Sequence, residues 1–343
     1  GNFQRWLPIL YVVGGVVLIV GIIIALNLFK NEEENISPDA IWLGTEWTYA
    51  ESDPEQIRAL VGRLKDHNIS TVYAWVSWLK EDGTWAGRRS GTNQFIEMET
   101  NVRAFVTAFR EAYPDATLYG WLGFPVELGA DGYRLDEPDM QERVADFSLK
   151  IVEDLGFDGV FLNVEQVWND NADDFVNLLI KVRSRMGEAG LIAAAIPPDW
   201  SPAEANIPKP PLIRPGTEWD KRFKQRVALL TDQMAIMAYN SGLSDPNDYV
   251  QWVAYQVQTY AQAVHELDGG AQIIIGIPTY DDELPGHDTR VENVPSALTG
   301  VKVGLQASGE AAVRIYGVAM YAAWTTDDTE WQQYFEEWAR TRG

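Results

Sequence analysis

The sequence contains no cysteine and only three histidines among its 343 residues. The lack of cysteine excludes disulfides, thiolate nucleophiles and cysteine-ligated metals. The histidines, His67, His265 and His287, are far apart in the chain, which argues against a zinc site. We therefore expect neither a bound metal nor a cofactor.

Basic residues are also scarce, with 27 Lys and Arg against 50 Asp and Glu and a formal net charge of −23. Such a chain would be repelled by a phosphate backbone, so no nucleic-acid partner is expected. Two of the basic residues, Arg5 and Lys30, and none of the acidic ones lie in the first 30 positions. The remainder thus has a formal charge of −25, and anionic lipid headgroups should repel it.

One long segment lacks charge altogether. Residues 7–29 form an uncharged run of 23 residues, enough for a helix to cross a hydrocarbon layer of about 30 Å. A cleavable signal peptide would have a shorter apolar region, so we interpret residues 1–30 as an uncleaved transmembrane anchor followed by a linker over 31–39. One basic residue flanks the span on each side, Arg5 before it and Lys30 after it. Because Glu32 to Glu34 follow Lys30 closely, we expect an inside N-terminus and an extracytoplasmic remainder.

Residues 40–343 alternate short apolar runs with stretches of helical periodicity, eight times over. The predicted strands are rich in β-branched and aromatic residues and span 41–48, 71–78, 117–124, 159–165, 191–196, 233–239, 272–278 and 315–324. The helices include 54–67, 101–113, 139–155 and 172–186, and Asp53 before Pro54 resembles an N-cap. Eight strand–helix units predict a (β/α)8 barrel, with a doubly wound open sheet as the alternative.

In either fold, functional side chains should lie at the carboxyl ends of the strands. Two long loops are expected at that face and could shape a cleft. Residues 197–215 are rich in proline, and residues 280–295 carry several acids.

The predicted fourth strand ends in Asn163 and Glu165, which the two-residue period places on one face above Phe161. A carboxyl group in an aromatic-lined barrel mouth suits general acid catalysis. The alternative is a structural Glu bonded to Asn163 or to nearby backbone.

The pattern Asp-Gly-x-x-x-Asn-x-Glu, from Asp158 to Glu165, resembles the fourth-strand motif of the family 85 endo-β-N-acetylglucosaminidases. It is similar, less closely, to the motif of the family 18 chitinases. The chitinase pattern has Asp where this chain has Phe161 and Asn163. Both families imply substrate-assisted catalysis, in which the 2-acetamido oxygen of the substrate attacks the anomeric carbon and no second carboxylate is needed.

The resemblance implies a role for each matching residue. Glu165 would act as general acid and then base, and Asn163 would orient the acetamido group. Met237 to Asn240 is similar to the chitinase Met-x-Tyr-Asp element, which makes Tyr239 a third catalytic candidate. Trp324 would form the floor beneath the sugar, and Asp158 and Asn240 join the binding candidates as motif positions.

Further aromatic and polar residues stand near the ends of other predicted strands. The chain contains 14 Trp and 14 Tyr. We expect some of these rings to stack against sugar rings and others to pack in the core. The remaining substrate-binding candidates are Glu46, Trp47, Trp75, Trp121, Tyr280 and Asp281.

The sequence therefore predicts a membrane-anchored retaining glycosidase that cleaves β-linked N-acetylglucosamine glycans. Two alternatives stay open. One is a two-carboxylate glycosidase that uses Glu165 and Glu283, whose carboxyl groups would lie about 5 Å apart. The other is a catalytically inactive barrel that binds sugar or serves as a structural subunit of a membrane assembly.

Overall fold

The computed structural model describes residues 38–88, 90–128, 132–280 and 287–342. The predicted membrane span over 7–29 lies outside these ranges, as do Asp281 and Glu283. Within the described part of the chain, no helix combines the length and apolar character that crossing a bilayer requires.

Eight parallel strands form a closed barrel, as predicted. In order around the barrel they are β1 (Ala40–Leu43), β2 (Thr71–Trp78), β3 (Thr117–Pro125), β6 (Gly159–Glu165), β7 (Leu191–Ile196), β8 (Gln233–Met237), β9 (Gln272–Pro278) and β10 (Ile315–Tyr321). Because Ala40 of β1 pairs with Ala319 of β10, the sheet closes and the open-sheet alternative is wrong. A two-stranded ribbon, β4 (Glu127–Leu128) with β5 (Gly132–Tyr133), stands apart from the barrel.

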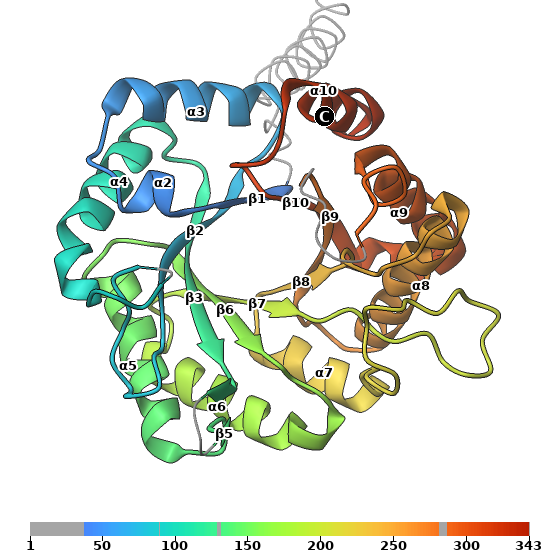
Figure 1. Ribbon diagram of the computed structural model, residues 1–343, viewed down its shortest axis with the longest axis horizontal. Helices are drawn as coiled ribbons and strands as arrows, with labels where there is room; N and C mark the ends of the chain where they lie inside the picture. The colour runs from blue at the N-terminus through green and yellow to red at the C-terminus, as the bar shows by residue number, and fades with distance from the viewer. Residues whose placement is uncertain (1–37, 89, 129–131, 281–286, 343) are drawn as a thin grey trace, which may run out of the picture. The chain divides into compact units, whose positions relative to one another are not determined.

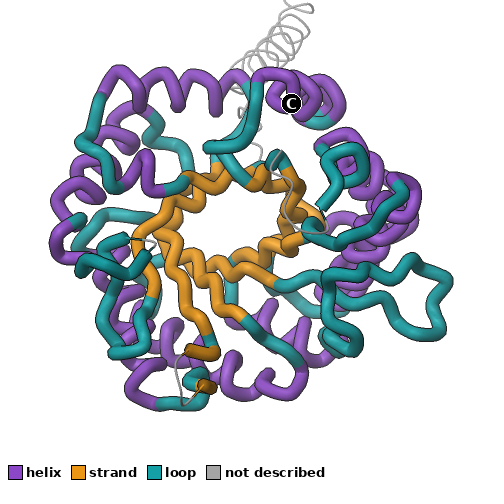
Figure 2. The backbone as a smooth tube through the Cα atoms, in the orientation of Figure 1, coloured by secondary structure: helices purple, strands orange, loops and turns teal. Residues whose placement is uncertain are grey.

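Helices surround the strands, as the two backbone views show (Figures 1 and 2). They are α2 (Thr45–Thr48), α3 (Pro54–Asp66), α4 (Glu99–Ala112), α5 (Pro138–Glu153), α6 (Ala172–Met186), α7 (Lys221–Leu230), α8 (Pro246–His265), α9 (Val294–Ser308) and α10 (Asp328–Glu337), with 3-10 turns at Phe95–Glu97, Asn169–Asn171, Gly309–Arg314 and Ala339–Thr341. The predicted cap at the start of α3 is confirmed, since the Asp53 carboxylate accepts from the backbone N–H groups of Glu55 and Gln56.

Three predicted strands are too long. The first ends at Leu43, and the residues predicted to extend it, including Glu46 and Trp47, form the short helix α2 instead. A local contact accompanies this change, because the Glu46 carboxylate accepts the backbone N–H of Gly44 over 3.0 Å. The strand predicted over 233–239 ends at Met237, and the one predicted over 315–324 ends at Tyr321.

The inside of the barrel is packed unevenly. Large rings project inward from β1, β2, β3 and β6, whereas alanines do so from β7, β8 and β10. The rings are Trp42, Tyr73, Trp75, Tyr119, Trp121 and Phe161, and the alanines are Ala193, Ala195, Ala235 and Ala319. The alanines leave space inside the barrel that the rings do not fill. A ligand could therefore bind beside the aromatic half.

A buried carboxylate links the two ends of the barrel sequence. Asp39, immediately before β1, is completely buried. It accepts the backbone N–H of Val318 over 2.7 Å, the hydroxyl of Tyr334 over 2.8 Å and the indole N–H of Trp338 over 2.9 Å. Such bonds offset the cost of burying a charge, and here they join β1 to β10 and α10.

Candidate functional site

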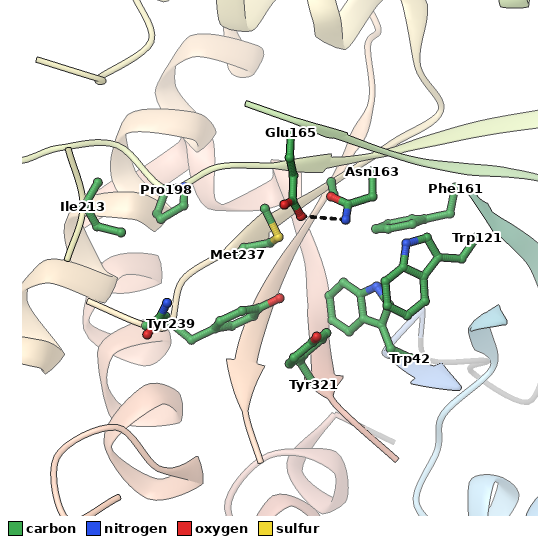
Figure 3. Close-up of a pocket in the computed structure, with 12 residues that line it drawn as sticks. Trp42, Trp121, Phe161, Asn163, Glu165, Pro198, Ile213, Met237, Tyr239 and Tyr321 are labelled. Atoms are coloured by element: carbon green, nitrogen blue, oxygen red, sulfur yellow. Dashed lines mark hydrogen bonds between the residues drawn. The ribbon is translucent and has the colours of Figure 1, made fainter. Parts of the chain in front are cut away.

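A cavity of about 250 Å³ opens at the carboxyl ends of the strands (Figure 3). Its walls come from the inner aromatic half, from the ends of β6, β8 and β10 and from the loop after β7. The lining residues are Trp42, Trp121, Phe161, Asn163, Glu165, Ala195, Pro198, Ile213, Met237, Tyr239, Asn240 and Tyr321.

The fourth barrel strand contributes three alternate residues to this cavity, as the two-residue period predicts. Phe161 is buried at the base, Asn163 is half-buried, and Glu165 is exposed at the mouth. Asn163 donates from Nδ2 to Oε1 of Glu165 over 2.7 Å, the contact drawn in Figure 3. The carbonyl oxygen Oδ1 of Asn163 is buried and has no hydrogen-bond partner among the described residues. Glu165 therefore has an oriented neighbour, and that neighbour retains an acceptor for a ligand N–H group.

Tyr239 follows β8 and forms another part of the wall. The residue is 9% exposed, and its ring stacks on Tyr321 with centroids 5.0 Å apart and an interplanar angle of 18°. Burial, reinforced by the nearby groups of Tyr321, Tyr280 and Glu165, raises the pKa of Tyr239 well above its usual value. The phenol is therefore protonated at neutral pH and can donate a hydrogen bond.

The proline-rich loop after β7 contributes Pro198 and Ile213, so it shapes the cavity as predicted. A buried ion pair of Asp199 with Lys224 anchors this loop. Asp199 also accepts the backbone N–H of Trp219 over 3.0 Å, and Trp219 donates its indole N–H to the carbonyl of Val167. Burial raises the pKa of Asp199, and the adjacent Lys224 ammonium opposes that rise. The loop is thus fixed to the segment that follows Glu165.

Several predicted binding residues lie away from the cavity wall. Asp158 precedes β6, at the opposite end of the barrel, where it accepts the backbone N–H of Leu118 over 2.7 Å and pairs with Arg110 over 2.5 Å. Because it lies at the amino end of β6, it bonds to the start of β3 and does not reach the cavity. Trp75 and Tyr280 are not among the lining residues either. Trp75 packs edge-on against Trp121, and Tyr280 packs edge-on against Tyr239.

The residues predicted near the ends of the first and last strands are displaced because those strands end early. Glu46 and Trp47 belong to α2 and are absent from the cavity lining. Trp324 is 37% exposed and contacts Tyr321 edge-on, with ring centroids 5.7 Å apart. Tyr321, the last residue of β10, lines the cavity, whereas Trp324 is not among its lining residues.

Sequence reasoning did not single out Trp42, Met237 or Tyr321 as wall residues. Trp42 could have been found, because alternation from Ala40 along β1 turns it into the barrel. The position of Met237 could have been read in the same way from β8. Predicting Tyr321 as a wall residue requires the position at which β10 ends, and no local pattern in the sequence marks that position.

The described lining residues offer one carboxyl group, two amides and two phenols for chemistry. Among the described residues, no cluster of three or more His, Asp or Glu side chains could hold a metal ion. An acid, a neighbouring amide and aromatic walls suit proton transfer to a polar ligand that also has apolar faces.

Searches by sequence gave no matching family model and no curated relative. Solved structures do resemble the barrel. A chitinase from Bacteroides thetaiotaomicron matches with a TM-score of 0.58 at 12% identity, over 89% of this chain and 96% of that chain. A family 18 chitinase from Pseudoalteromonas aurantia matches with a TM-score of 0.53 at 12% identity, over 87% and 99%. The spore cortex-lytic enzyme SleL of Bacillus cereus matches with a TM-score of 0.54 at 11% identity, over 88% and 74%. The chain therefore has a family 18 chitinase-like (β/α)8 fold.

Proposed function

We propose that the chain is a retaining glycoside hydrolase that cleaves β-linked N-acetylglucosamine glycans by substrate-assisted catalysis. The main support is the composition of the cavity wall. Among the described lining residues, Glu165 is the sole carboxyl group, and Asn163 beside it keeps a buried carbonyl without a partner. One acid plus an amide acceptor is the set that this mechanism needs, because the substrate itself supplies the nucleophile.

In the first step, Glu165 donates its proton to the glycosidic oxygen as that oxygen leaves the anomeric carbon. The acetamido carbonyl oxygen of the same sugar attacks that carbon and forms a cyclic oxazolinium ion. The Asn163 Oδ1 atom accepts the acetamido N–H and thereby favours the attacking form, while the Tyr239 hydroxyl donates to the acetamido oxygen and orients it. In the second step, a water oxygen attacks the anomeric carbon while the Glu165 carboxylate takes a proton from that water. The bond between the anomeric carbon and the acetamido oxygen breaks, which restores the acetamido group and gives overall retention.

The rest of the wall suits a sugar with this group. Trp42, Trp121 and Tyr321 offer flat apolar faces against which a sugar ring can lie. The cavity of about 250 Å³ is slightly smaller than the roughly 300–1,000 Å³ typical of pockets for drug-sized ligands. It fits a single sugar unit, with the rest of the glycan lying outside it. Chitinase-like structural neighbours agree with a carbohydrate substrate.

The deciding experiment compares the parent chain with Glu165→Gln on N-acetylglucosamine oligomers and on high-mannose glycopeptides. Loss of a general acid commonly lowers the rate by a factor of roughly 10² to 10⁴, so we expect a loss of that size without a change in melting temperature. Glu188→Gln is the matched control, because Glu188 is exposed at the opposite end of the barrel. Equal turnover by the parent and Glu165→Gln would reject the site.

The same assay separates the two alternatives. Glycan binding by a parent chain that shows no turnover would favour the inactive, sugar-binding barrel. A loss in Glu283→Gln as large as that in Glu165→Gln, together with a trapped covalent glycosyl-enzyme, would favour the two-carboxylate mechanism.

We also propose that residues 7–29 anchor the chain in a membrane with the barrel outside the cytoplasm. The uncharged run and the acid-rich remainder support this placement. Protease added to intact cells without an outer barrier should remove the barrel, and complete protection there would reject the proposed orientation.

A further inference from the structure

A buried carboxylate lies beneath the turn that follows Tyr239. Glu292 is 1% exposed. It accepts the backbone N–H groups of Asn240 over 2.6 Å, Ser241 over 2.7 Å and Gly242 over 3.1 Å, and the hydroxyl of Ser241 as well. A single side chain thus binds three consecutive backbone donors of a segment about 50 positions earlier in the chain.

This arrangement suits a carboxylate and no other side chain of similar size. All four contacts are donors, so an ionised carboxylate can accept each of them, whereas the amide of Gln would direct its own N–H₂ at some. Hydrogen bonds from several N–H groups also offset the cost of burying the charge. Glu292 is itself fixed, because its backbone N–H bonds to the carbonyl of Asp288 and the next residue, Asn293, caps α9.

Two residues of the cavity wall adjoin this contact, since Tyr239 directly precedes the turn that Glu292 binds and Asn240 is its first residue. Asn240 has a φ of +56°, in the left-handed region that non-glycine residues seldom adopt. Three backbone bonds to one carboxylate offset the cost of this conformation. Because Tyr239 lies between the end of β8 at Met237 and this turn, the direction of its side chain depends on a contact outside the cavity.

The other ionisable groups around Glu292 connect it to the same wall. His287 lies with Nδ1 3.4 Å from Oε2 of Glu292, and both side chains are fully buried. The His287 ring packs on Tyr280 at 4.3 Å between centroids, and Tyr280 meets Tyr239 edge-on at 6.0 Å. Burial and, after it, the Glu292 charge raise the pKa values of Tyr280 and Tyr249, so both phenols are neutral neighbours.

We propose that Glu292 is a positioning residue of the glycosidase site: by holding the Asn240–Gly242 turn, it sets the Tyr239 hydroxyl where the acetamido group of the substrate must lie. This inference rests on the proposed function. Glu292 touches neither the cavity nor a substrate in it, so it acts through the turn alone. Its loss should therefore lower kcat more than it raises KM, because misplacement by about 1 Å can lower a rate by roughly 10².

The experiment compares Glu292→Gln with Asp39→Asn in the 343-residue chain. Asp39 is the matched control, since it is also a buried carboxylate with several donors but lies before β1, at the end of the barrel opposite the cavity. Both variants should lower the melting temperature. At a temperature where both are folded, Glu292→Gln should lower kcat by about 10-fold to 100-fold with KM within about threefold of the parent. Asp39→Asn should keep the parent kcat. Parent-like kcat in Glu292→Gln, or equal losses in the two variants, would overturn the proposal.

Amide hydrogen exchange gives a second readout that does not depend on activity. The amides of residues 240–242 should exchange faster in Glu292→Gln than in the parent, and at the parent rate in Asp39→Asn. If Glu292→Gln does not fold, Ser241→Ala removes one donor to the carboxylate and should give smaller changes of the same kind. A parent chain without turnover would reject the proposed function, and unchanged exchange at 240–242 would separately reject the positioning role.

Discussion

Asn163 donates its amide Nδ2 to the Glu165 carboxylate over 2.7 Å, which leaves its buried Oδ1 as the acceptor. An Asp at the same position would present a charged acceptor to the acetamido N–H, whereas Asn presents only a neutral carbonyl. In the mechanism proposed above, the acetamido nitrogen therefore keeps its proton while the carbonyl oxygen attacks, which gives the oxazolinium ion. In that mechanism, Asn163 would link the proposed general acid, Glu165, to the acetamido group of the substrate.

Asn163→Ala should abolish turnover of the intact glycan yet permit slow processing of a preformed oxazoline. The variant lacks the acceptor that promotes ring closure, but Glu165 is still present to activate water. Both rates are measured on the same preparation together with its melting temperature. Equal loss of the two activities, accompanied by lower thermal stability, would instead make Asn163 a structural partner of Glu165.

Tyr239→Phe should lower kcat by roughly 10-fold to 10²-fold while the melting temperature stays near that of the parent. The change removes a hydroxyl and keeps the ring that stacks on Tyr321. Tyr119→Phe serves as its control, because Tyr119 is a buried inward ring of β3 that does not line the cavity. If both variants behave alike in steady-state kinetics, the Tyr239 hydroxyl has no special role.

The floor of the site can be assigned by comparing Tyr321→Ala with Trp324→Ala. Tyr321 lines the cavity, whereas Trp324 is 37% exposed beside it. We expect Tyr321→Ala to weaken binding of a short N-acetylglucosamine oligomer at least tenfold, and Trp324→Ala to change it by less than about threefold. Calorimetric titration in the Glu165→Gln background measures both without turnover. The reverse order would restore Trp324 as the floor.

Asp39→Asn should reduce the free energy of unfolding by about 2–4 kcal/mol, because the amide N–H₂ would face donors that now bind a carboxylate. Asp53→Asn is a suitable reference, since Asn also caps helices well and should change stability by less than about 0.5 kcal/mol. Urea denaturation of both variants checks the difference. A small effect at Asp39 would mean that the pairing of β1 with β10 keeps the barrel closed without these bonds.

The sequence predicts the barrel well because parallel strands buried on both faces are continuous apolar runs that stand out between amphipathic helices. Strand ends are predicted less well. The segment after Leu43 contains Trp and Thr, which favour strands, yet it forms a helical turn in which the Glu46 carboxylate accepts the Gly44 N–H. Propensity alone cannot anticipate such a contact.

Residues of the candidate site also differ in how well the sequence predicts them. Asn163 and Glu165 could be placed from alternation along a single strand, so the structure puts both in the cavity. The motif also makes Asp158 a binding candidate. However, the seven residues of β6 separate Asp158 from the cavity, so it lies at the other end of the barrel. Glu292 could not be identified at all, because its importance comes from a turn about 50 residues away and no local pattern marks that pairing.

The contacts of Asp39 also have a consequence for the order of folding. Its partners Val318 and Trp338 lie 279 and 299 positions later in the chain. Contacts of such long range form late, because the entropy of closing the intervening loop must be overcome first. During synthesis, β1 can therefore pair with β10 only after almost the entire chain has been made. Until then the edge of β1 is unpaired, and an unpaired strand edge can pair with another chain and promote aggregation.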